Sequence, residues 1–241
     1  MTGRVAAGIT GAMVANLIAA LVRAFAQLSE RPTLRLVLAS AGLTLLLLVA
    51  LWGGVITLLA STRLFDMAWL ERVVDWAGGA TALVAAWFLL PAVAGLVAGL
   101  FAEQVAAHVE RRHYPGLPPA AGQSLLAGLA TGLRFALLVL AVNVLALPAY
   151  LLLFFLPPLN VALYVLLNGW LLGREYFELV AYRRLDRAAA LALRRRLGGT
   201  LFLAGAVTVG LFAVPGLNLL APFIATALMA HLLAPHFFAA T

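Results

Sequence analysis

The chain has 241 residues, of which 65% are hydrophobic and only 10% are charged, and its mean hydropathy is +1.07. Soluble domains carry about 25% charged residues, so this composition excludes a soluble protein and indicates an integral membrane protein. All 16 basic residues are arginine, against nine acidic residues, and the arginines flank apolar segments. That placement favours contact with anionic lipid over nucleic acid. The absence of cysteine excludes disulfides and thiolate metal sites.

The first apolar segment, residues 12–28, is short for a membrane span and contains Asn16, Arg23 and Gln27. We therefore expect an N-terminal interfacial helix, with a weakly hydrophobic first span as the alternative. A cleaved signal peptide is not expected, because Asn16 interrupts the run and the chain that follows is itself apolar.

Two long transmembrane helices are expected next, over residues 32–60 and 77–113. Proline is favoured at the first position of a helix, so the first of them should begin at Pro32. Its last 25 residues carry no charge and would cover roughly 37 Å, enough to cross a hydrocarbon core of about 30 Å. The second contains a Gly95-x-x-x-Gly99 pattern, which fits either packing within the chain or a dimer contact.

Two stretches near residues 135–173 and 197–235 carry no charged side chain, and each is broken by a proline-containing turn ending in Leu-Asn. Most of the arms on either side of these turns are shorter than the roughly 20 residues that a full crossing needs. We therefore predict two hemi-penetrating helical hairpins. Backbone groups freed at such turns must face protein or water, so Asn160 and Asn218 either line a polar path or cap the helix that follows.

A charged helix is expected over residues 174–196, between the two hairpins. With these spans, two arginines lie in the connection between the long helices and the other fourteen lie on the opposite side. The positive-inside rule then places the N-terminus and the 174–196 segment in the cytoplasm.

No pattern typical of a catalytic centre or a metal site is present, so neither an enzyme nor a cofactor is expected. One candidate anion site is present, at the start of the first long helix. There the backbone N–H groups of Thr33, Leu34 and Arg35 would lack intrahelical acceptors, and Arg35 and Arg31 would add positive charge. The alternative is that both arginines only anchor the span at the cytoplasmic surface.

Four segments together resemble the EI24/CysZ family of membrane proteins over roughly residues 20–235. The most specific is Asn168-Gly-Trp-Leu-Leu-Gly-Arg-Glu-Tyr-Phe-Glu-Leu-Val-Ala-Tyr-Arg-Arg184. The others are Pro32-x-Leu34-Arg35, the Leu-Pro-Pro-Leu-Asn turn at residues 156–160, and Pro215-Gly-Leu-Asn-Leu-Leu-Ala-Pro222.

The resemblance implies a single all-α membrane domain with two long transmembrane helices and two hemi-penetrating hairpins. It also implies a homo-oligomer, a dimer or a multiple of dimers, in the bacterial inner membrane that takes up sulfate for cysteine synthesis. Sulfate would bind at Thr33, Leu34 and Arg35, where the CysZ branch has a Gly-Leu-Arg motif. Here Thr33 replaces the glycine, Leu36 stands where a second arginine often follows, and Glu175-Tyr-Phe-Glu178 replaces an Asp-Tyr-Pro pattern.

Sulfate transport is thus the leading hypothesis, and a non-transporting membrane scaffold or assembly factor is the alternative. A sulfate dianion cannot cross hydrocarbon unaided, so transport requires a water-filled path. The candidates to line this path are Asn160, Asn218, Glu103 and Arg134. The expected partners are therefore sulfate, membrane lipid and further copies of the chain.

Overall fold

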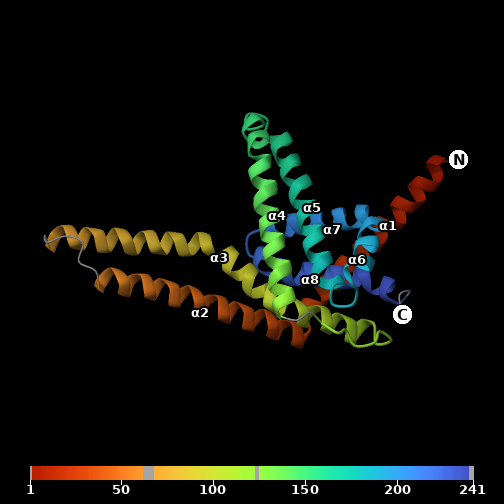
Figure 1. Cartoon of the computed structure of the whole chain (residues 1–241), viewed down its shortest axis with the longest axis horizontal. Coiled ribbons are helices and arrows are strands. Elements are labelled where there is room, and N and C mark those ends of the chain that lie inside the picture. The colour runs from red at the N-terminus through yellow and green to blue at the C-terminus, as the bar shows by residue number, and fades with distance from the viewer. Residues whose placement is uncertain (1, 62–67, 123–124, 239–241) are drawn as a thin grey trace. The chain divides into compact units, whose positions relative to one another are not determined.

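A computed structural model of the chain describes residues 2–61, 68–122 and 125–238. Within these ranges the regular structure is helical throughout, with no strand. Figure 1 shows the helices in chain order: α1 (Thr2–Leu28), α2 (Arg31–Ser61), α3 (Ala68–His113), α4 (Leu125–Leu152), α5 (Pro157–Ala181), α6 (Arg187–Arg196), α7 (Gly198–Ala213) and α8 (Leu217–Phe237).

Four of the described helices contain a stretch that is long and apolar enough to cross a membrane. These stretches are Gly11–Leu28, Arg31–Leu58, Leu133–Leu152 and Leu217–Phe237. The prediction of an all-α membrane protein is therefore confirmed. The first stretch contains the segment expected to lie in the interface, and its length and composition also fit the alternative of a first span.

The N-terminal helices differ from the expected bounds in length. α1 begins at Thr2 instead of residue 12, and α2 begins at Arg31, one residue before Pro32. α3 is 46 residues long and begins at Ala68, so residues 68–76 extend the second long helix rather than forming a loop. Arg63, one of the two arginines expected in the connection between the long helices, lies outside the described residues.

The first hairpin consists of α4 and α5, which run side by side from a turn at residues 153–156 (Figure 1). Pro157 opens α5, where its missing N–H and fixed φ suit the first helical position. α5 has 25 residues, yet it does not qualify as a span by itself, whereas α4 does. Asn160, Tyr164 and Asn168 lower the hydropathy of α5.

The charged segment 174–196 is two helices, which corrects the expectation of one. Its first part continues α5 to Ala181, and the chain then turns before α6 begins at Arg187. Asp186 is the N-cap of α6, and its carboxylate accepts a hydrogen bond of 2.7 Å from the Ala189 N–H. α6 and α7 follow each other with a bend of 84°.

The second hairpin consists of α7 and α8, joined by a turn that contains Gly216. The φ of Gly216 is +81°, a conformation that side chains disfavour, so glycine is required here. α7 has 16 residues and does not span alone, but α8 has 21 and does. In each hairpin, therefore, one helix is long and apolar enough to cross a membrane by itself and the other is not.

The chain divides into two compact units, a larger one of residues 1–33 and 102–241 and a smaller one of residues 34–101. The core of the larger unit lies where α8 packs against α1, α5 and α7. Consistent with this position, 78% of the α8 span is buried. In the smaller unit, leucine side chains such as Leu38, Leu45 and Leu46 are exposed, as expected for a lipid-facing helix.

Glycines allow α5 and α7 to approach backbone to backbone in the larger unit. A β-carbon on Gly205 of α7 would overlap the carbonyl oxygen of Gly169, and one on Gly173 would overlap the carbonyl oxygen of Leu201. Gly169 and Gly173 form a Gly-x-x-x-Gly pattern, which places both on one face of α5. This contact fixes the first hairpin against the second.

Candidate functional site

The corner between α1 and α2 determines which backbone donors are free at the predicted anion site. Ser29 and Glu30 form the turn, and their N–H groups donate to the carbonyls of Ala26 and Gln27 at 3.2 and 3.0 Å. Because α2 begins at Arg31, the N–H groups of Leu34 and Arg35 already lie within the helical hydrogen-bond pattern. The free donors of the first turn are thus those of Arg31 and Thr33, a smaller set than expected.

The side chains of this first turn divide between two faces of α2. Arg31, Leu34 and Arg35 are exposed, whereas Thr33 is 2% exposed and its hydroxyl has no hydrogen-bond partner among the described residues. Arg31 and Arg35 are four residues apart and therefore lie on the same face of the helix. Neither forms an ion pair within the part of the chain that the structure describes.

A polar network behind the corner holds it against the end of α3 and against α8. The Glu30 carboxylate lies 2.6 Å from Nε2 of His108 and 3.7 Å from Nε2 of His113. The Tyr114 hydroxyl lies 3.2 Å from Nδ1 of His231, and the rings of His113 and His231 are 5.0 Å apart. All these residues belong to the larger unit, so the network fixes where α2 starts.

In the sequence these histidines show no spacing typical of a metal site, and the network was not predicted. Among the described residues, no group of three or more histidine or acidic side chains has a geometry suited to a metal ion. His108 and His113 are five residues apart near the end of α3, a spacing that does not place them on one face of a helix. Nothing in the sequence indicated that Glu30, 78 residues earlier, would lie beside them.

The four residues predicted to line a path occupy separate places in the larger unit. Glu103 is exposed on α3 next to Gly122, and Arg134 is exposed on α4. Asn218 is half-buried in the first turn of α8. Asn160 does not cap its own helix: its amide donates a 3.2 Å hydrogen bond to the carbonyl of Tyr150, near the end of α4. No hydrogen bond or ion pair joins these four side chains to one another in the described chain.

Ion pairs hold the charged segment to its surroundings. Arg183 and Arg184 share the buried carboxylate of Glu110 on α3, with N–O distances of 2.9 Å each. Arg174 and Arg194 share Glu178, at 2.7 and 2.6 Å. Glu178 therefore pairs with arginines of the charged segment itself, whereas Arg183 and Arg184 pair with α3.

Glu175 lies outside the apolar part of α5, and burial raises the pKa of its carboxyl from 4.5 to about 7. The folded state therefore holds this proton more tightly than the unfolded state does. The stability that comes from the protonated form is complete below about pH 4.5 and is lost as the pH rises through about 7.

Glu175→Gln keeps the neutral, hydrogen-bonding form at every pH. We expect the melting temperature of the wild type in detergent to fall between pH 4.5 and pH 8 relative to that of Glu175→Gln. Thermal unfolding across this range checks the prediction, and parallel profiles for the two proteins would contradict it.

These observations define an all-helical, multi-pass membrane protein with an arginine-bearing helix start. Residues 20–222 match the protein family described as Sulfate transporter CysZ/Etoposide-induced protein 2.4. The chain belongs to this EI24/CysZ family, as its sequence motifs predicted. No individual curated protein matches it.

Proposed function

We propose that this protein carries sulfate across the bacterial inner membrane and so supplies sulfur assimilation and cysteine synthesis. The observation that supports this most is the family match, which covers 203 of the 241 residues, from 20 to 222. The N-terminus and the 174–196 segment would face the cytoplasm, and the chain would work as a homo-oligomer.

The anion would be captured at the first turn of α2. Arg31 and Arg35 project from one face of the helix and have no acidic partner among the described residues, so their guanidinium groups are available to a dianion. Guanidinium groups bind tetrahedral oxyanions through charge-assisted hydrogen bonds, and the positive end of the helix dipole adds to the attraction. The free N–H groups of Arg31 and Thr33 supply further donors, while Leu34 offers an apolar boundary.

From this site the anion would move along a polar path. Asn160, Asn218, Glu103 and Arg134 remain our candidates to line it, because each is a polar side chain on a largely apolar helix. Arg134 would favour anions, whereas Glu103 would have to be offset by a positive charge or a proton.

We expect Arg35→Ala to reduce the uptake of labelled sulfate into proteoliposomes by about tenfold or more at low sulfate concentration. A hydrogen bond to a charged group contributes about 1.5–3 kcal/mol, and about 1.4 kcal/mol corresponds to a factor of ten. Arg112→Ala is the matched control, because Arg112 is also an exposed arginine but ends α3 instead of beginning α2.

Three outcomes separate the possible functions. Uptake that is lost in Arg35→Ala but retained in Arg112→Ala would support both transport and the capture site. Equal uptake by the wild type and both variants would show that the capture site lies elsewhere in the protein. If the wild type does not exceed empty liposomes, the alternative function, a membrane scaffold or assembly factor, would replace transport.

A further inference from the structure

The α4–α5 hairpin contains polar side chains although residues 135–173 include no charged residue. On α5, Asn160, Tyr164 and Asn168 follow one another at intervals of four residues, so they form a stripe along one face of the helix. On α4, Asn143 and Tyr150 are seven residues apart and also share a face. Polar residues in membrane helices are costly, and such a stripe indicates a polar environment on that side.

Asn143 of α4 and Asn168 of α5 are satisfied within their own helices. The Asn143 amide donates to the carbonyl of Val139 at 2.8 Å, and the Asn168 amide donates to the carbonyl of Tyr164 at 3.0 Å. Asn160 behaves differently, because its amide reaches across the hairpin to the carbonyl of Tyr150. The remaining polar groups therefore gather at the turn end of the hairpin.

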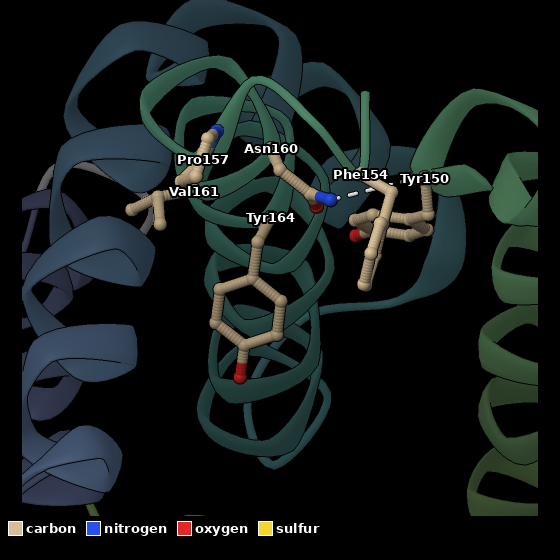
Figure 2. A pocket seen from close by; sticks show the side chains of 6 residues that line it. All are labelled: Tyr150, Phe154, Pro157, Asn160, Val161 and Tyr164. Carbon is tan, nitrogen blue, oxygen red and sulfur yellow. Dashed lines mark hydrogen bonds between the residues drawn. The ribbon is translucent and has the colours of Figure 1, made fainter. Parts of the chain in front are cut away.

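A pocket of about 480 Å³ lies at this end of the hairpin, entirely within the larger unit. Figure 2 shows the Asn160 amide directed toward α4 and the Tyr164 ring running along α5. The pocket is lined by Tyr150, Phe154, Pro157, Asn160, Val161 and Tyr164.

The Tyr150 hydroxyl is a polar group at this pocket that the described part of the chain leaves unsatisfied. Its oxygen is buried and has no hydrogen-bond partner among the described residues. Leaving a buried polar group without a partner costs about 1–3 kcal/mol, so native proteins usually supply one. A ligand in the pocket would provide it.

The donors and the size of the pocket indicate what kind of ligand fits. Its polar side chains are Tyr150, Asn160 and Tyr164, which are neutral and can each donate a hydrogen bond. Water occupies about 30 Å³ per molecule in the liquid, so the volume holds an oxyanion together with several waters. Residues 135–173 of the hairpin carry no carboxylate that would repel an anion and no cation that would trap it. A transport site needs this balance, since its ligand must enter and leave.

We propose that the pocket formed by Tyr150, Asn160 and Tyr164 is a second oxyanion site, at which a partly hydrated tetrahedral anion is held by neutral donors. The identity of the anion, sulfate, rests on the proposed function. The pocket itself rests on separate observations, namely the polar stripe, the cavity and the unpartnered hydroxyl.

The direct test uses 3-fluorotyrosine placed at Tyr164 and 19F NMR of the purified full chain in detergent. Sodium sulfate is titrated against sodium chloride at equal ionic strength. We expect the resonance to shift saturably with sulfate but not with chloride. Tyr150→Phe, which removes only the hydroxyl, should weaken the apparent sulfate affinity about tenfold. Asn143→Ala should leave the apparent sulfate affinity unchanged, because Asn143 lies on α4, as Tyr150 does, but does not line the pocket.

A resonance that does not respond to sulfate, or responds equally to chloride, would overturn the proposal. So would an affinity that Tyr150→Phe leaves unchanged. Failure of the proposed function is a different result: wild-type proteoliposomes would take up no sulfate while the 19F titration still saturated. If uptake depends on Arg35 but the 19F resonance shows no sulfate-specific response, the protein transports sulfate without binding it in this pocket.

Discussion

Replacing Gly205 with valine is expected to prevent the two hairpins from packing and to lower the apparent melting temperature by about 10 °C or more. Overpacking a well-filled interior costs about 1–3 kcal/mol, and a backbone contact relaxes less readily than a side chain. Here the new β-carbon would overlap the backbone of both Gly169 and Gly173. For a chain of this size, about 3 kcal/mol corresponds to roughly 10 °C. Thermal unfolding of detergent-purified protein measures the change.

Gly210→Val is the matched control for this experiment. Gly210 lies in the same helix, is exposed, and has no described atom within 4 Å of the position that a β-carbon would take. Both variants change helix propensity equally, so the difference between them isolates the contact with α5. Similar melting temperatures for the two variants would show that α5 and α7 do not pack through these glycines.

Glu110→Gln is expected to destabilise the protein by about 3–5 kcal/mol, because it removes the partner of two arginines. Arg183 is 4% exposed and Arg184 is largely shielded, so neither guanidinium can compensate through water. Arg184 also donates to the carbonyl of Pro118 at 2.8 Å, so the loop after α3 should loosen as well. The free energy of unfolding in denaturant, or the melting temperature, provides the measurement.

The comparison for Glu110→Gln is Glu178→Gln, in which a carboxylate is again shared by two arginines. There the side chains of Arg174 and Arg194 are about 30% exposed, and solvent can replace the lost partner. Because solvent reaches these arginines, this variant should lose less stability than Glu110→Gln. A larger loss for Glu178→Gln than for Glu110→Gln would contradict the assignment of Glu110 as the buried anchor.

The two glycine patterns illustrate a limit of sequence reasoning. Gly95 and Gly99 form the same Gly-x-x-x-Gly spacing as Gly169 and Gly173, and the spacing alone does not tell which pair meets another helix. In the structure, a β-carbon at Gly99 would have no described neighbour within 4 Å, whereas one at Gly173 would meet the backbone of α7. Only the position of a second helix distinguishes them.

At the candidate site, too, some features follow from neighbouring residues in the sequence and others from contacts between distant residues. Proline at a helix start is a local signal, so the beginning of α2 was predicted to within one residue. That Thr33 points inward while Arg31 and Arg35 point outward depends on what α2 packs against. The pairing of Glu30 with His108 and His113 joins residues about 80 positions apart, and no periodicity reports such a contact.

The sequence by itself determined the class of the protein, the family, the main helices and the turns between the hairpin arms. These follow from hydropathy, charge and proline positions, which act over a few residues and need no knowledge of the rest of the chain. Tertiary structure decided the contact between α5 and α7, the partners of the buried charges and the existence of the Tyr150 pocket. Each of these depends on which helix faces become neighbours, and that is settled by packing of the whole chain rather than by any one segment.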